Sequence, residues 1–352
     1  MSSRIAVPMG QDITEAVLAL RQGHLVGFPT ETVYGLGADA LNEAAVAAVF
    51  AAKGRPVDHP LIVHVAGSAV LDEWAIDIPP LARRLAEAFW PGPLTLVLKK
   101  HPRVPVAVTG GQDTIALRVP NHPLCLRLLQ TFGGGIVGPS ANRYQRVSPT
   151  CAQDVSEELG DKLAYIVDGG ACIVGIESTI VACGPDGTAQ ILRQGAISAS
   201  ALQSVLQPLA AKTPVAAASS PRVPGAGAIH YAPEKPVFMV DYNTLVERLL
   251  ALATQDKHPT VSVLAFSPKP KVLSMWPGLD WQVMLRDHVV YQQQLYARLR
   301  AFDKSTADQL WIESVPTEMD AWLAVYDRLQ RATARAQFSP TQRTSMNFGR
   351  SF

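Results

Sequence analysis

Apolar residues recur with two different periods along the first 210 positions of the chain. Residues 12–22 repeat them every three to four positions, which predicts an amphipathic helix, and Asn42 is a suitable cap for a second helix that ends before Gly54. Further helices are predicted over residues 81–89 and 198–206. Short apolar runs predict strands over residues 24–28, 61–65, 94–98, 114–119, 135–137, 164–167, 178–182 and 190–193. Helices mixed with short strands predict a two-layer α/β domain built on a mixed sheet.

The pattern changes after residue 209. Residues 210–228 are small, contain several prolines and carry almost no charge, which is typical of a linker. Beyond them, predicted strands and helices alternate over residues 237–240, 242–253, 261–266, 289–302 and 309–312. This alternation predicts a small, parallel, Rossmann-like sheet, and it contains no G-x-G-x-x-G nucleotide motif. The expected organisation is therefore a domain over residues 10–208, a linker over 209–235 and a second domain over 236–345.

Composition and charge exclude several classes of protein. The 352 residues carry a formal net charge of +1 and are 48% hydrophobic, which excludes a polycation that coats nucleic acid and a disordered chain. The four cysteines have no spacing that suits zinc, and no run approaches the ~18 apolar residues of a membrane helix. Because the N-terminus also lacks the apolar core of a signal peptide, we expect a soluble, cytoplasmic protein without membrane contact. The 25 residues after Asp327 hold five Arg and no acid, which suggests a solvated, partly frayed tail, with an RNA contact as the alternative.

Polar clusters follow several of the predicted strands, where α/β folds place ligands. Residues 53–56, Lys-Gly-Arg-Pro, bring two cations to one loop and suit a phosphate clamp, although the helix dipole alone also favours cations there. Residues 133–142 are similar to a phosphate loop, but they lack its Gly-Lys-Ser/Thr ending. Further clusters occupy residues 28–37, 175–180 and 192–195, and each is a weak signal alone. No nucleophile or metal motif accompanies them, so the sequence favours a reaction governed by positioning and charge neutralisation.

In this order, the clusters resemble the threonylcarbamoyl-adenylate synthase family in its long form, a YrdC-like domain followed by a linker and a small Rossmann-like domain. The motifs that carry the resemblance are P-T-E-T-V-Y-G-L-G at 29–37, K-G-R-P at 53–56, P-L-I-V-H at 60–64, W-P-G-P-L-T at 90–95, R-V-P at 118–120, P-S-A-N at 139–142, S-P-T at 148–150, G-I-E-S-T-I at 175–180, L-R-Q-G at 192–195 and H-Y-A-P at 230–233. They are dense over residues 10–200 and looser beyond, and together they are highly specific.

The resemblance implies an enzyme that joins L-threonine, bicarbonate or CO2 and ATP into threonylcarbamoyl-adenylate and releases pyrophosphate. It also implies Mg²⁺ held mainly through the ATP phosphates, and downstream transferase proteins that move the product to an adenosine beside the tRNA anticodon. This chemistry suits the clusters. A carbamate of threonine is already an anionic nucleophile, so the enzyme has to bring two anions together rather than supply a strong base.

The resemblance also assigns roles to individual residues. The threonine-binding positions are Thr32, His64, Arg118, Gly138 and Ser178, with Arg118 paired to the substrate carboxylate. The ATP-binding positions are Arg55, His59, Thr114, Ser140, Ser148, Arg193 and Tyr231. Lys53, Arg55, Ser140 and Asn142 form the catalytic tetrad that lines the phosphate and carbamate site, and no residue is assigned to a metal.

Three positions depart from the family pattern. His59 stands where relatives often carry Asn, and its charge varies with pH. Gly138 replaces a common Ala and leaves a backbone contact available. The linker lacks the Met and the basic residue that some relatives have before H-Y-A-P, yet its Gly- and Ala-rich composition suits a lid that carries Tyr231 over the nucleotide.

Two other functions fit part of the sequence. YrdC-like domains also resemble RNA-binding folds, but residues 1–210 hold 15 Lys or Arg against 18 Asp or Glu, a net charge of −3 that disfavours RNA binding. A carbamoyl transferase that uses carbamoyl phosphate is the second alternative, and its required co-substrate distinguishes it.

Overall fold

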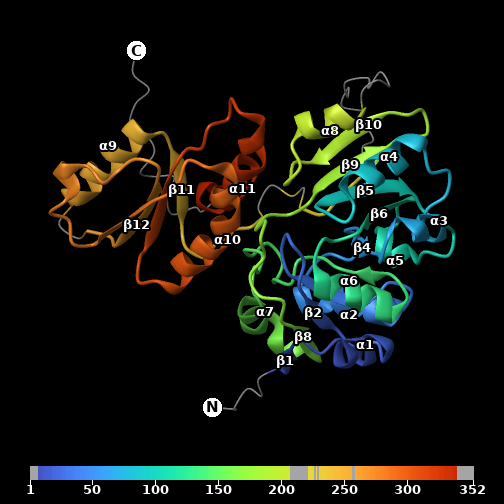
Figure 1. Cartoon of the computed structure of the whole chain (residues 1–352). Helices are drawn as coiled ribbons and strands as arrows, with labels where there is room; N and C mark the ends of the chain where they lie inside the picture. The colour runs from blue at the N-terminus through green and yellow to red at the C-terminus, as the bar shows by residue number, and fades with distance from the viewer. Residues whose placement is uncertain (1–6, 207–220, 226, 228–229, 256–257, 339–352) are drawn as a thin grey trace. The chain divides into compact units, whose positions relative to one another are not determined.

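The structure, a computed structural model, describes residues 7–206, 221–225, 227, 230–255 and 258–338 (Figure 1). The chain forms two compact units. The first comprises Met1–Tyr144 and Ser148–Ala226, and the second comprises Gln145–Val147 and Gly227–Phe352. The linker predicted over 209–235 lies partly outside the described residues. Of its described residues, 221–225 belong to the first unit, and 227 and 230–235 belong to the second.

The first unit is built on one mixed sheet of ten strands, in the order β1-β8-β2-β3-β7-β4-β6-β5-β9-β10. The strands are β1 Met9–Gly10, β2 Val26–Phe28, β3 Gly35–Asp39, β4 Ile62–His64, β5 Leu94–Lys99, β6 Thr114–Arg118, β7 Ile136–Val137, β8 Tyr165–Val167, β9 Thr179–Cys183 and β10 Ala189–Arg193. Parallel and antiparallel neighbours both occur, for example β4 with β6 and β5 with β6. The mixed sheet predicted from the sequence is confirmed.

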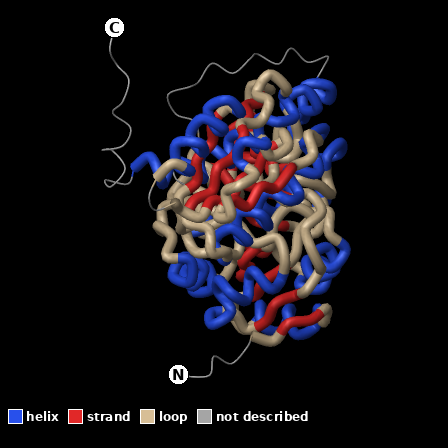
Figure 2. Tube along the Cα trace, turned by 90° about the vertical axis from the view of Figure 1, so that its left-hand side faces the viewer, coloured by secondary structure: helices blue, strands red, loops and turns tan. Residues whose placement is uncertain are grey.

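The first unit also contains α-helices, drawn in blue in Figure 2. They are α1 Ile13–Arg21, α2 Glu43–Lys53, α3 Leu71–Trp74, α4 Pro80–Phe89, α5 Val106–Thr109, α6 Pro123–Phe132, α7 Ala152–Leu159 and α8 Ala199–Leu206. The side chain of Asn42 accepts the Ala45 N–H at 3.1 Å and starts α2, and Gly54 ends it with φ +62°, a conformation that costs glycine little. This ending places Lys53 and Arg55 on either side of the turn.

Four neighbouring strands, β4, β6, β5 and β9, present two different faces because successive side chains point to opposite sides of a sheet. On one face Val63, Leu96 and Leu117 are fully buried in a core that includes residues of α2, α4, α7 and α8. The opposite face carries a smaller apolar cluster at its centre, formed by Ile62, Val97, Ala116, Ile180 and Val223. Segment 221–225 therefore covers part of this second face.

The second unit is a parallel sheet of four strands in the order β11-β14-β12-β13. Its elements are β11 Val237–Val240, α9 Tyr242–Ala253, β12 Val261–Ala265, β13 Leu279–Val283, α10 His288–Lys304, β14 Gln309–Glu313 and α11 Leu323–Phe338. The small, parallel, Rossmann-like sheet predicted for this part of the chain is confirmed. Among the described residues, no helix is long and apolar enough to span a membrane.

Several elements differ from the sequence-based expectation. The chain after Asp327 continues α11 to Phe338, so the interpretation of this stretch as a solvated, partly frayed tail is wrong up to that residue. Its polar sequence hides a packed face: Arg328 is fully buried, 2.6 Å from Asp327 and 5.1 Å from the centre of the Tyr231 ring. Residues 339–352 lie outside the described part. The sequence analysis also missed strands β1, β3 and β13 and helices α3, α5, α6 and α7.

Gly195 provides a test of the packing at the end of β10. A Cβ atom there would lie 2.3 Å from the backbone of Ser178 and Thr179, so Gly195→Ala has to move one of two backbone segments. We expect a loss of about 1–3 kcal/mol in the free energy of unfolding, seen as a melting temperature lower by about 2–4 °C per kcal/mol. Gly67→Ala is the matched control because a Cβ there meets nothing within 4 Å. Equal melting temperatures for the two variants would contradict this packing.

Candidate active site

Polar side chains gather at one end of the second face of the sheet. His64 ends β4 and pairs with Arg118, which ends the parallel strand β6. Strands β5 and β9 run the other way, so Thr95 near the start of β5 and Ser178 just before β9 lie at the same end. The Thr95 and Ser178 hydroxyl oxygens are 2.8 Å apart, and all four side chains are buried. The alternating directions of the strands thus place these four side chains in one row across the sheet. Three of them were predicted from the sequence, and Thr95 was not.

Arg118 is held by several groups on the protein side. Its Nη2 lies 2.8 Å from Glu31 Oε1, and its Nη1 donates to Thr32 Oγ1 at 2.9 Å. Its Nε donates to the Gly92 carbonyl at 3.3 Å. The Arg118 and Glu31 side chains are 5% and 2% exposed, so this is a buried ion pair whose charges solvent does not screen. The guanidinium is therefore fixed in orientation before any ligand binds.

His64 lies beside this ion pair and is electrically neutral at ordinary pH. Burial and the nearby Arg118 charge lower the pKa of its imidazole to about 3. Its Nδ1 atom is buried without a hydrogen-bond partner among the described residues. A Cβ at Gly138 would lie 2.6 Å from that atom, so a glycine there allows the ring to sit against the backbone. A buried, unpartnered ring nitrogen is suited to a hydrogen bond with a small polar ligand.

The residues predicted to contact phosphate lie toward the other end of the same strands. Strand β7 runs antiparallel to β4, so the chain from Gly138 to Asn142 runs back toward the start of β4. There the Lys53 Nζ donates to the carbonyl oxygens of Ser140 and Asn142, both at 2.5 Å. Burial and the adjacent Arg55 charge hold the pKa of Lys53 well below its usual value. Two of the hydrogen bonds that the Lys53 ammonium group can donate thus hold the 140–142 loop in place.

Arg55 and His59 flank the same end of β4. The Arg55 Nη2 donates to the Pro60 carbonyl at 2.8 Å, and the His59 ring lies 5.7 Å from the Tyr144 ring in an edge-on contact. Partial burial and the Arg55 charge lower the pKa of His59, so its imidazole is neutral at pH 7. Thr114, which begins β6, is four residues from Arg118 on the same face, roughly 13 Å along the strand.

The remaining predicted residues of the first unit join this arrangement through hydrogen bonds. Arg193 Nη2 donates to the Ser178 carbonyl at 2.9 Å, and its Nη1 donates to the Pro224 carbonyl at 2.9 Å. Ser148 Oγ donates to Glu177 Oε1 at 2.8 Å, next to Ser178 in the chain. Arg193 therefore connects a threonine-site residue with segment 221–225.

Segment 221–225 is also anchored at its other end. Arg222 forms an ion pair with Asp58 at 3.0 Å and donates to the Gly110 carbonyl. Its backbone N–H donates to Gln112 Oε1 at 2.7 Å. The segment thus lies along the second face between the loop before β4 and Arg193.

Tyr231 is the one predicted site residue that the structure describes within the second unit. Its ring stacks on Tyr296 at 5.6 Å and lies under the Arg328 guanidinium, and its backbone has φ +58°. The other predicted residues all belong to the first unit.

Sequence analysis gave no role to three residues that complete these contacts, Glu31, Thr95 and Glu177. Glu31 and Glu177 stand inside two of the quoted motifs, next to Thr32 and Ser178. An acid that adjoins a predicted ligand residue directly after or before a buried strand is the signal that could have indicated them. Their partners, Arg118 and Ser148, are distant in sequence and emerge only from the fold.

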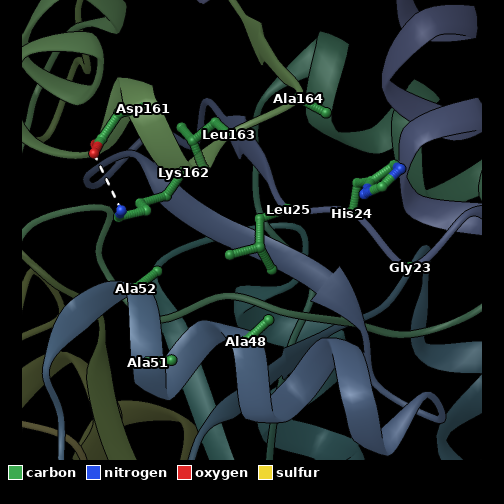
Figure 3. Close-up of a pocket in the computed structure, with 10 residues that line it drawn as sticks. All are labelled: Gly23, His24, Leu25, Ala48, Ala51, Ala52, Asp161, Lys162, Leu163 and Ala164. Carbon is green, nitrogen blue, oxygen red and sulfur yellow. Dashed lines mark ion pairs between the residues drawn. The ribbon is translucent and has the colours of Figure 1, made fainter.

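A separate pocket of the first unit contains none of these residues. It lies beside α2 and just before β2 and β8 (Figure 3). Its volume is about 610 Å³. Ala48, Ala51 and Ala52 form one wall, and an Asp161–Lys162 ion pair lies at its edge. Its small, weakly polar lining offers no chemistry comparable to the row at His64 and Arg118.

Two successive parts of the chain match known protein families. Residues 18–195 match the Sua5/YciO/YrdC family model, described as telomere recombination, and residues 197–334 match the threonylcarbamoyl-AMP synthase C-terminal domain. The crystal structure of P. abyssi Sua5 complexed with L-threonine superposes with a TM-score of 0.82 at 34% identity, covering 94% of this chain and 98% of that one.

Two threonylcarbamoyl-AMP synthases show the family. Those of Pyrococcus abyssi and Bacillus subtilis are each 37% identical to this chain, over 89% and 91% of its length and 92% of their own. The chain belongs to the threonylcarbamoyl-AMP synthase family and is an enzyme of that type, with ATP as a substrate.

The neutral His64 leads to a prediction about acid stability. The unfolded chain takes up a proton on this residue near pH 6.5, whereas the folded protein does so only near pH 3. Unfolding therefore binds a proton between these values, and His64 lowers the free energy of unfolding progressively as the pH falls from about 6.5. We expect the drop in melting temperature between pH 7.5 and pH 5 to be smaller in His64→Gln than in the wild type. His24→Gln, at an exposed position, is the control, and an unchanged drop in His64→Gln would argue against a buried neutral imidazole.

Proposed function

We propose that the second face of the first unit's sheet is where L-threonine, bicarbonate or CO2 and ATP are joined into threonylcarbamoyl-AMP with release of pyrophosphate. The observation that carries the proposal is the division of this face into two ends. Arg118 and His64 end β6 and β4, while Arg55 contacts the Pro60 carbonyl just before β4 and Lys53 holds the 140–142 loop. The two ends suit two anionic substrates, and the strands fix their separation.

At the end formed by Arg118, we propose that L-threonine binds. The guanidinium offers a charge-assisted contact to the substrate carboxylate, and Glu31 keeps it in place. Thr32, Ser178 and the His64 Nδ1 then offer hydrogen bonds to the amine and hydroxyl groups, with the backbone at Gly138 alongside. Because these groups are buried, each hydrogen bond forms in a medium of low dielectric, where a threonine analogue without its hydroxyl leaves a partner unsatisfied.

At the end formed by Lys53 and Arg55, we propose that the ATP phosphates bind. Arg55 is partly exposed and donates to the Pro60 carbonyl just before β4. The Ser140 and Asn142 side chains, on the loop that Lys53 holds, supply neutral hydrogen-bonding groups. Lys53 contributes mainly by holding this loop. The other residues proposed to contact ATP are His59, Thr114, Ser148, Arg193 and Tyr231.

The chemistry needs alignment and charge neutralisation more than proton transfer. The carbamate oxygen of carboxylated threonine attacks the α-phosphorus, a new P–O bond forms, and pyrophosphate leaves with its electron pair. Among the described residues, no three His, Cys, Asp or Glu side chains gather as metal ligands. Magnesium prefers phosphate and water ligands, so we propose that Mg²⁺ binds through the ATP phosphates and offsets their charge.

The product is a reactive mixed anhydride, which water hydrolyses. We propose that the enzyme works in the cytoplasm and passes the product to threonylcarbamoyl-transferase proteins that modify tRNA. The transfer chemistry itself needs an acceptor amine, which belongs to the tRNA.

The phosphate end is tested by removing its cations one at a time. We expect Lys53→Ala and Arg55→Ala to lower threonine-dependent pyrophosphate release by at least ~100-fold, about 2.7 kcal/mol of transition-state stabilisation. Arg83→Ala is the control, because this exposed arginine of α4 pairs with Asp72 and α4 packs against the opposite face of the sheet. Near-normal turnover in both variants would reject the role of this loop.

The threonine end is tested by a variant that leaves no buried charge unpaired. In the double variant Glu31→Gln/Arg118→Gln, both charges of the ion pair are removed, so the fold keeps neutral partners of similar size. We expect its KM for threonine to rise by ~100-fold or more, while its KM for ATP stays within about two-fold. An equal increase in both constants, or none, would contradict a carboxylate contact at Arg118.

A further inference from the structure

Three residues of the second unit lie in the sequence between two residues of the predicted ATP and phosphate site. Asn142 and Ser148 belong to the first unit, but Gln145–Val147, which lie between them, cluster with the second unit. Only five residues separate Asn142 from Ser148, so the path of this loop depends on where its middle is held. The second unit therefore has a direct mechanical connection to two positions proposed to meet ATP or its phosphates.

Each residue of the tripeptide has a contact within the second unit. The Gln145 carbonyl accepts the Ala232 N–H at 3.0 Å, and the Val147 carbonyl accepts Arg300 Nη1 at 3.0 Å. Arg146 pairs through Nη1 with Glu234 at 2.6 Å and through Nη2 with Asp303 at 3.2 Å. Gln145 adopts φ +66°, a left-handed conformation that is costly for a residue with a side chain and persists only when its surroundings hold it.

Asp303, on α10, is the centre of these contacts. Its carboxylate accepts the backbone N–H groups of Glu234 and Lys235 at 2.8 and 3.3 Å, in addition to its ion pair with Arg146. The Asp303 side chain is 14% exposed and that of Glu234 is 72% exposed. Because solvent screens an exposed pair much more than a buried one, the Arg146–Asp303 pair holds the loop and the Arg146–Glu234 pair contributes little.

We propose that Asp303 and Arg146 are positioning residues for ATP, through which the second unit sets the conformation of the 142–148 loop. This inference rests on the proposed function of that loop. Threonine binding, by contrast, uses Arg118, His64 and Thr32, none of which stands in the loop. The two substrates therefore respond differently when the pair is broken, which a general loss of structure does not produce.

The test measures KM for each substrate in the full-length enzyme. Asp303→Asn keeps the shape of the side chain and removes its charge, and Arg146→Gln removes the other partner. We expect either change to raise the KM for ATP by ~10-fold, with the KM for threonine and the melting temperature nearly unchanged. The double variant is expected to be no worse than Arg146→Gln alone, because both changes break one interaction. Glu234→Gln, which removes the exposed partner of the same arginine, is the matched control and should stay within two-fold of the wild type.

Three results overturn the inference: an unchanged KM for ATP in variants that fold normally, an equal rise in both KM values, or additive effects in the double variant. If Asp303→Asn fails to fold, Arg146→Gln, at a partly exposed residue, still decides between the first two results. Failure of the proposed function gives a different result. In that case the wild type turns over ATP, and Arg55→Ala does so at the same rate.

Discussion

The alternation of side chains across four short strands is the constraint on which the site depends. In β4, β6, β5 and β9, one set of alternate positions is committed to the main core. The other set is therefore free to differ along the strands, with apolar residues such as Ala116 at the centre and polar ones such as Arg118 at one end. A shift of any strand by one residue would exchange the two faces and bury the wrong set. The fold and the site are therefore specified by the same pattern.

Buried charges are the second common feature of this site, and each has an identified partner. Arg118 faces Glu31, Lys53 faces two backbone carbonyls, and Arg193 faces the carbonyls of Ser178 and Pro224. Such partners compensate the loss of hydration and hold the groups in fixed positions. A reaction between two anions gains most from groups that need no rearrangement, because the energetic cost of ordering them is met during folding.

The sequence predicted local features well and distant partners poorly. Helix α2 could be read from Asn42 and Gly54 because caps are determined by neighbouring residues. Strand β3 was not predicted, since Gly35 and Gly37 have low strand propensity. In the fold these glycines leave room for neighbouring side chains: a Cβ at Gly35 would lie 2.5 Å from the Phe28 ring. The pairing of Glu31 with Arg118 was not predictable, because 87 positions separate the two residues and only the fold brings them together. The same holds for Arg146, whose partner lies on α10 in the second unit.

Product analysis by mass spectrometry tests the central claim most directly. The enzyme is incubated with ATP, Mg²⁺, L-threonine and ¹³C-labelled bicarbonate, and the mixture is examined at once for the mixed anhydride. If both anions meet on this face of the sheet, a threonylcarbamoyl-adenylate that contains one ¹³C atom forms only when all three substrates are present. Turnover of ATP that requires carbamoyl phosphate instead, or a product without the label, would contradict the account.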